Sequence, residues 1–226
     1  MKIFIIILFS VLMINAQSFN VEKVNGNVKQ QSSGEENWIN VKSGESIELN
    51  SMLMTEKNSS VRLSNGSSFF VLKESSVVLV SDIKKMTTEE LLLALAMEDM
   101  LNAPRKKDKS KSHDTAVYGT NENGKKQNGA GNYDYGVKRL NGAMQLSENG
   151  FKESAVVAAK ETYRKYPAVK EIPSYRIFFA DILLDKGLTE DAYGEYVSIS
   201  KLSLNEKEKL DVEKKIALLE KKIITN

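Results

Sequence analysis

Cysteine is absent from this chain of 226 residues, and histidine occurs only once, at position 113. The lack of cysteine excludes disulfides, thiolate zinc sites, thiol catalysis and a lipidated N-terminal cysteine. A single histidine cannot build a multi-histidine metal site, and it argues against a Ser-His triad. His113 itself stands between Ser112 and Asp114 in a polar stretch, which is typical of a solvated loop. We therefore predict that the protein is not an enzyme and holds no metal and no cofactor.

Neither sign of charge dominates the sequence. Lys and Arg number 32 against 30 Asp and Glu, which gives a net charge of +2. Such a small excess does not indicate binding to nucleic acid, and we predict no nucleic-acid partner. Charged residues make up 27% of the chain, close to the average of about 25% for globular proteins. The length suits one or two folded domains.

Long apolar runs are also missing, apart from a short one at the N-terminus. Lys2 precedes an apolar run over residues 3–14, and Ala16 occupies the position before a cleavage site. This run has the length of a signal-peptide core, whereas a membrane-spanning helix needs roughly 20 apolar residues. We predict a signal peptide over residues 1–16, cleaved before Gln17, and an exported, periplasmic protein with no integral membrane segment after cleavage. The alternative is an uncleaved N-terminal anchor.

Residues 21–80 alternate between short apolar runs and turn residues. Two of the apolar runs flank Asn65-Gly66. Asn-Gly between apolar runs is a strong hairpin signal, because a type I′ turn needs positive φ at both central residues. Strands at this spacing predict a small all-β sandwich or roll, which we place in a domain over residues 17–120.

A helix interrupts the β pattern. Thr87 and Glu90 form a capping box, leucines follow at helical spacing and a proline ends the run, which predicts a helix over residues 87–103 inserted into the β domain. Residues 105–112 read RKKDKSKS and are interpreted as a solvated basic loop. The alternative for this loop is a site for an anionic partner such as an acidic polysaccharide, phospholipid headgroups or nucleic acid. Residues 115–120 are predicted to form a last strand.

The second half of the sequence is predicted to be helical. Residues 121–132 are rich in Asn, Gly and Lys and are interpreted as a flexible linker, followed by a helical domain over residues 133–226. Thr189 is predicted to cap one helix, and Asn205 with Glu208 to cap the last one. The chain is thus predicted to be a multi-domain α and β protein.

An internal repeat lies in the helical half. Gly150 aligns with Gly187, and Ala155 aligns with Ala192, five residues after the glycine in each copy. Glycine permits a left-handed turn between two helices, and alanine lets antiparallel helices approach closely. The repeat predicts stacked helical hairpins.

Two sets of spaced residues resemble known families. The first set contains glycines, apolar residues and a threonine at Gly26, Val28, Trp38, Gly44, Thr55, Val61, Leu63 and Asn65-Gly66-Ser67, with Val117-Tyr118-Gly119-Thr120 as a closing segment. In these positions the β part resembles the FecR domain, an extracytoplasmic all-β module. That resemblance implies a sensing or binding role outside the cytoplasm, often coupled through a membrane helix to a sigma-factor regulator. We expect only the extracytoplasmic module to apply to this chain.

The second set lies in residues 137–204 and consists of Ala143, Gly150, Ala155, Tyr163 and Pro167. Their order is similar to that of tetratricopeptide repeats, and the resemblance implies paired helices that present a concave face to a partner. Of the aromatic residues at helical spacing, most are expected in the core. Tyr166 and Tyr196 are predicted to bind a partner.

These patterns together predict a non-catalytic, exported binding or scaffold protein, in which a β module is joined to a helical-repeat interaction module. A protein of the cell envelope is the predicted partner, and a cell-wall glycan is the alternative. The alternative function is an extracytoplasmic sensor component of a FecR-type signalling system.

Overall fold

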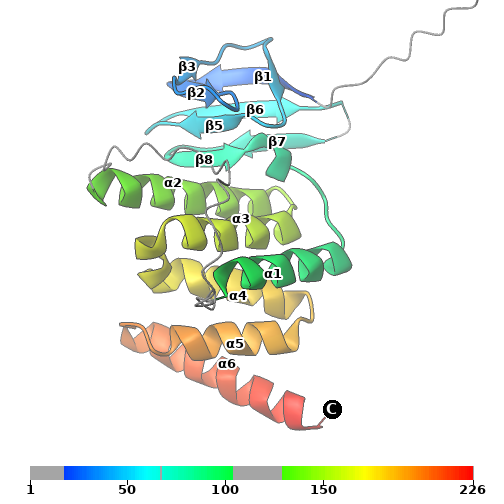
Figure 1. The fold of residues 1–226 in the computed structure, drawn as a ribbon, viewed down its shortest axis with the longest axis vertical. Coiled ribbons are helices and arrows are strands. Elements are labelled where there is room, and N and C mark those ends of the chain that lie inside the picture. Colours follow the sequence, from blue (N-terminus) through cyan, green and yellow to red (C-terminus); the bar gives the residue numbers. More distant parts are fainter. Residues whose placement is uncertain (1–17, 67, 104–128, 226) are drawn as a thin grey trace, which may run out of the picture.

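The computed structural model describes residues 18–66, 68–103 and 129–225. Figure 1 shows the strands at one end of an elongated molecule, with helices stacked below them and the C-terminal helix at the opposite end. The predicted division into an N-terminal β part and a C-terminal helical part is confirmed. The signal peptide, the basic loop over residues 105–112 and the strand over residues 115–120 lie outside the described residues.

Among the described residues, eight strands form two four-stranded sheets in which every neighbouring pair is antiparallel. The first sheet has the order β4 (Ser46–Glu48), β1 (Ser18–Asn25), β6 (Ser60–Ser64) and β7 (Phe69–Leu72). The second has the order β3 (Ile39–Asn40), β2 (Val28–Gln31), β5 (Met52–Thr55) and β8 (Ser76–Leu79). Strands β7 and β8 are therefore the edges of their sheets.

The hairpin formed by β6 and β7 follows the predicted alternation. Val61 and Leu63 are buried while Arg62 between them is exposed, because successive side chains of a strand point to opposite faces. Gly66 has a positive φ of 84°, as a turn glycine should. Strand β6 ends at Ser64 and β7 begins at Phe69, so the two strands are further apart in the sequence than the predicted two-residue turn allows.

Six α-helices and two short 3₁₀ turns complete the described part of the chain. They are η1 (Val80–Asp82), α1 (Thr88–Asn102), α2 (Gly129–Glu148), α3 (Lys152–Lys165), η2 (Pro167–Glu171), α4 (Pro173–Asp185), α5 (Thr189–Ile199) and α6 (Glu206–Thr225). The capping box of Thr87 and Glu90 at the start of α1 is confirmed, as is that of Asn205 and Glu208 before α6.

Two boundary predictions need correction. Residues 129–132, assigned to the linker, already belong to α2, because the packing of this helix outweighs the poor helix propensity of its glycines. Helix α1, predicted as an insertion in the β domain, packs against α3 and so belongs to the helical stack. Its buried Leu91 and Leu95 find their apolar partners there.

The internal repeat is confirmed at the level of individual hydrogen bonds. Gly150 and Gly187 have φ values of 89° and 77°. The N–H of Phe151 donates to the carbonyl of Leu146 at 2.9 Å, and the equivalent bond from Leu188 to Leu183 measures 3.0 Å. Each glycine therefore closes one helix in a Schellman motif and reverses the chain into the next.

The prediction that Thr189 caps α5 is wrong. The capping position is occupied by Leu188, and Thr189 is already helical. The turn is so short that the residue before α5 also supplies the apolar contact that ends α4. The position before α5 therefore has to be apolar, and Leu188 occupies it in place of a polar capping residue.

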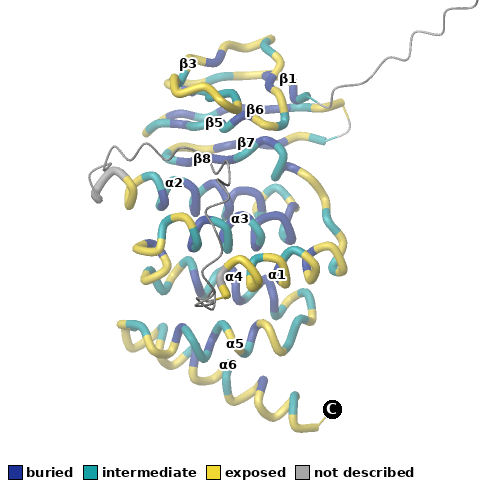
Figure 2. Tube along the Cα trace, in the orientation of Figure 1, coloured by how far each residue is buried: buried dark blue, intermediate teal, exposed yellow. Residues whose placement is uncertain are grey.

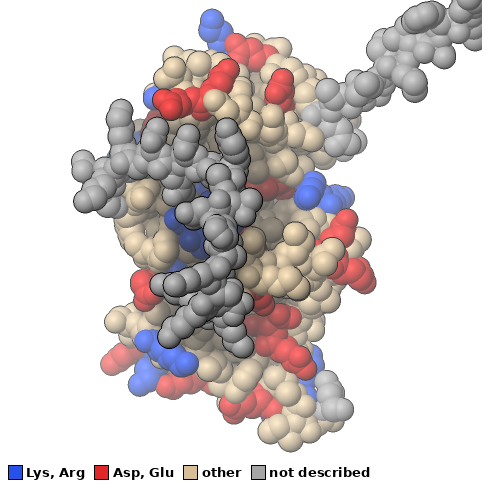
Figure 3. Space-filling model, viewed as in Figure 1, with Lys and Arg blue, Asp and Glu red and all other residues tan. Residues whose placement is uncertain are grey.

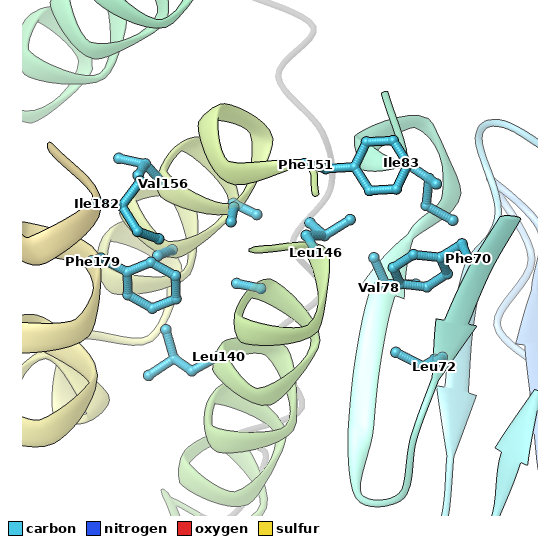
Figure 4. Packing of buried hydrophobic residues seen from close by; sticks show 14 of the residues in the cluster. Phe70, Leu72, Val78, Ile83, Leu140, Leu146, Phe151, Val156, Phe179 and Ile182 are labelled. Carbon is cyan, nitrogen blue, oxygen red and sulfur yellow. The ribbon is translucent and has the colours of Figure 1, made fainter. Parts of the chain in front are cut away.

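One hydrophobic cluster joins the strands to the helices. Figure 4 shows Phe70 and Leu72 of β7 facing Leu146 of α2 and Phe151, and the cluster continues to Phe179 of α4. The rings of Phe70 and Phe151 lie 6.3 Å apart. Figure 2 shows buried residues running without interruption from the sheets into the helices. The two parts share a core.

Candidate functional site

Helix α2 closes the edge formed by β7 and β8. Asn149 accepts a hydrogen bond from the backbone N–H of Val71 at 3.0 Å and donates one to the carbonyl of Val71 at 3.1 Å. One turn earlier, Gln145 accepts from the N–H of Lys73, and a further turn earlier Asn141 donates to the carbonyl of Ser75 at 2.8 Å. Asn141 and Gln145 share one face of α2 and Asn149 follows its last residue, and together the three amides pair backbone groups of β7 and of the segment between β7 and β8.

Glycine allows this close approach at one point. A Cβ atom on Gly142 of α2 would lie 2.0 Å from the carbonyl oxygen of Val77 in β8. Two ion pairs lie near the contact. The Nζ of Lys138 is 2.7 Å from Oε2 of Glu56, and the Nζ of Lys73 is 2.6 Å from Oε2 of Glu148. This surface is a structural joint between the strands and the helices.

A cavity of about 420 Å³ lies beside this joint, lined by Lys73, Asn141, Gln145 and Glu148 among others. Its lining groups are the ones that hold the joint together. Gln145 donates to Ser76 at 2.6 Å, and Asn141 accepts from the hydroxyl of Tyr175 at 2.5 Å. We therefore interpret these side chains as stabilising the fold and not as a binding site.

A different cleft opens between α1, α3, α4 and α5. It has a volume of about 340 Å³ and is lined by Leu95, Asp99, Lys160, Leu183, Glu190, Asp191, Gly194 and Glu195. Four of these eight residues are acidic, and Lys160 is the cation among them. The cleft is therefore acidic.

Two cations neutralise the carboxylate on the inner side of the cleft. Glu195 is paired with Lys160 and lies 2.8 Å from the guanidinium of Arg176, whose side chain is only 3% exposed. Burial acts to raise the pKa of Glu195, but Lys160 and Arg176 outweigh it and hold the pKa below its ordinary value. Glu195 is therefore charged, and both of its carboxylate oxygens are already paired with a cation, Lys160 or Arg176.

The remaining acids of the cleft, Asp99, Glu190 and Asp191, are exposed on its rim. Burial raises the pKa of Asp191 above its ordinary value, and the nearby charges of Asp99 and Glu190 raise it further, against the effect of Lys160. These neighbouring negative charges create a negative potential at the mouth of the cleft, which favours the binding of a positively charged group.

A small apolar void adjoins this cleft and shares Lys160, Leu183 and Glu195 with it. Tyr163 lines the void, and its buried hydroxyl makes no hydrogen bond to any described residue. Burial raises the pKa of this hydroxyl. This phenol group lines the void and is not among the residues that line the cleft.

The two tyrosines predicted to bind a partner do not belong to this cleft. Tyr166 is half-buried, and its ring packs 5.6 Å from that of Tyr135 on α2. Tyr196 is 0% exposed; its hydroxyl donates to Asp181, and the ammonium of Lys215 lies 5.3 Å from its ring centre. The prediction for Tyr196 is corrected, because a side chain between α4 and α6 without exposed surface is a core residue.

The sequence analysis missed both the rim acids and the outer face of α1. Leu92, Leu93, Met97, Met100 and Leu101 of this helix are exposed. The available signal was that α1 contains more leucine and methionine than one buried face of a helix requires.

Searches against protein families, characterised proteins and solved structures gave no match to this chain. Among the described residues, no helix combines the length and apolar character needed to cross a bilayer. Within those same residues, no three His, Cys, Asp or Glu side chains come together as metal ligands.

Proposed function

We propose that this chain is a non-catalytic, exported binding protein of the cell envelope, in which a FecR-like β module carries a stack of tetratricopeptide-like hairpins. The acidic cleft between α1, α3, α4 and α5 is the observation that carries the proposal. A rigid body of helices that share their core with a β module supports such a cleft well, because its lining residues come from four helices fixed by packing.

The partner that fits this cleft is a protein segment with Lys or Arg side chains. Asp99, Glu190 and Asp191 offer acceptors on the rim, and the charges of Asp99 and Glu190 both act on Asp191. A cationic side chain would pair with them at the mouth and extend its aliphatic stem over Leu95 and Leu183. The pairing also relieves the repulsion between the rim acids.

The experiment uses a fluorescent hexalysine peptide as the probe and the chain from Gln17 onward. Fluorescence anisotropy measures its affinity, with hexaglutamate as the opposite-charge control. The double variant Glu190→Gln, Asp191→Asn should weaken hexalysine binding by about tenfold, because each exposed ion pair contributes about 0.2–1 kcal/mol. Added salt should weaken the binding further.

The matched control removes two exposed carboxylates from α6, in the double variant Glu206→Gln, Glu213→Gln. Its net charge equals that of the cleft variant, so any difference between the two reports the position of the charge. Equal affinities of the two variants, or no binding of hexalysine to the parent chain, would refute the proposal.

A further inference from the structure

The outer face of α6 has a repeat of seven residues. Glutamate and lysine stand next to each other at 206–207, 213–214 and 220–221, and an apolar residue follows each glutamate after four positions, at Leu210, Ala217 and Ile224. All of these residues are exposed, Leu210 to 70% and Ile224 to 84%. The opposite face of the helix, with the buried Val212 and Leu219, packs on α5. Figures 1 and 2 show α6 at the end of the stack, with exposed residues on its outer side.

The repeat places opposite charges on the two sides of an apolar line. At about 100° per residue, the apolar stripe of Leu210, Ala217 and Ile224 stays within about 20° of the direction of Ala217. The acidic row, Glu213 and Glu220, lies about 40–60° to one side of that direction, and the basic row, Lys214 and Lys221, lies about 40–60° to the other. Figure 3 shows side chains of both signs at this end of the molecule. The stripe therefore has negative charge along one border and positive charge along the other.

The two rows are little used within the molecule. Neither lysine of the basic row makes an ion pair with any described residue, because the ion pairs of α6 use Lys209 and Lys215 instead. In the acidic row, Glu213 lies 3.9 Å from the ammonium of Lys209, and Glu220 accepts a hydrogen bond from the hydroxyl of Tyr193 at 2.9 Å. Both rows can therefore pair with the charges of another molecule.

We propose that the outer face of α6 binds the same face of a second copy of the chain, with the two helices parallel about a two-fold axis. The axis runs alongside the helices, so each residue of the apolar stripe meets its own equivalent, as an isologous interface requires. The rotation brings the basic row of each copy beside the acidic row of the other. Lys214 then lies beside Glu213 of the second copy, and Lys221 beside Glu220 of the second copy. The face is thus complementary to itself in charge.

Charge also selects the parallel orientation. In an antiparallel pair each row would lie beside the same row of the other copy, so that lysines meet lysines and glutamates meet glutamates, and both contacts repel. A seven-residue repeat with charged residues beside its apolar positions is the pattern by which paired helices set their orientation. The small side chain of Ala217 at the middle of the stripe lets the helices approach closely. The interface does not depend on the acidic cleft, because α6 contributes no residue to the lining of that cleft.

Sedimentation velocity of the chain from Gln17 onward tests the charge pairing. The parent chain should become dimeric between about 10 and 500 μM, because one helix per copy makes a small and weak interface. Glu213→Lys together with Glu220→Lys should raise the dissociation constant at least about tenfold, because both borders of the stripe are then basic. Lys214→Glu together with Lys221→Glu should weaken the dimer in the same way with two acidic borders. An equimolar mixture of these two double variants should dimerise again, since a basic face then meets an acidic one.

The matched control places the same change of charge away from α6. Glu35→Lys together with Glu36→Lys alters two exposed residues between β2 and β3 and should leave the dissociation constant unchanged. All substituted residues are exposed, so circular dichroism should show the fold intact in every variant. A parent chain that stays monomeric over the whole range overturns the proposal, and so does a control that weakens the dimer as much as the α6 variants do.

The absence of cysteine allows a direct test of the orientation. Leu210→Cys and Ile224→Cys each place one thiol per copy on the apolar stripe. In a parallel pair, mild oxidation of either variant alone should give disulfide-linked dimers, because each thiol faces its own equivalent. When the two variants are mixed, no disulfide should join position 210 to position 224, since about 21 Å of helix separates them. A 210–224 disulfide as the main product, identified by peptide mass spectrometry, would overturn the parallel pairing.

Discussion

Gly142→Ala tests the joint between the sheets and the helices. The added Cβ would lie 2.0 Å from the carbonyl oxygen of Val77 and 2.7 Å from its carbonyl carbon. Both are backbone atoms of a strand, so no side chain can rotate away to relieve the contact. Helix α2 must move off β8, which also weakens the hydrogen bonds of Asn141 to Ser75, just before β8, and of Asn149 to Val71 in β7.

The magnitude follows from two opposing effects. Replacing glycine by alanine inside a helix normally stabilises a protein by about 0.5–1 kcal/mol, whereas overpacking a tight core costs about 1–3 kcal/mol. Because the clash is with backbone, the cost outweighs the gain, and we expect Gly142→Ala to lower the free energy of unfolding by up to about 2.5 kcal/mol.

Gly194→Ala is the matched control for this substitution. Gly194 also lies inside a helix, α5, but a Cβ there would meet nothing within 4 Å. It should raise the free energy of unfolding by about 0.5–1 kcal/mol. Urea denaturation followed by circular dichroism measures both variants, and a shared core predicts a single transition for strands and helices. A Gly142→Ala protein as stable as Gly194→Ala would refute the close contact of α2 with β8.

Two other substitutions probe the same region. Asn149→Ala leaves the N–H and carbonyl of Val71 without their partner and should cost about 1–3 kcal/mol in urea denaturation; an unchanged midpoint would contradict the role of this amide as an edge partner. Burial raises the pKa of Asp82 from 3.8 to about 6, although Arg139 acts to lower it, so the folded carboxyl keeps its proton at a pH where the unfolded one has lost it. The free energy of unfolding should therefore fall as the pH rises from about 4 to about 6. Asp82→Asn should flatten this pH dependence and stabilise the protein at pH 7, as measured by unfolding at several pH values. An unaltered pH dependence would contradict the raised pKa of Asp82.

Features that depend on a few neighbouring residues were predicted correctly. The capping box of Thr87 and Glu90 and the turns at Gly150 and Gly187 formed as expected. Each is closed by hydrogen bonds between residues no more than five apart, so the sequence pattern and the structure contain the same information. The hairpin of β6 and β7 was predicted for the same reason, although its loop is longer than expected.

Predictions that depended on distant contacts fared differently. Tyr196 was expected on an open surface, but α4 and α6 enclose it. Thr189 has the right chemistry for a cap, yet the adjoining helix end required a leucine at the capping position. The rim acids of the cleft come from α1 and α5, separated by about ninety residues, and only packing brings their charges together.

The sequence by itself determined the order of strands and helices, the positions of the glycine turns and the repeat of the helical hairpins. These follow from backbone preferences and from apolar periodicity, which act over one or two turns of chain. Only the tertiary structure decided that α1 leaves the β part to pack on α3, and that α2 closes the sheet edge at Gly142. Those choices depend on which apolar surfaces and unpaired backbone groups become neighbours once the chain is compact, and no local pattern contains that information.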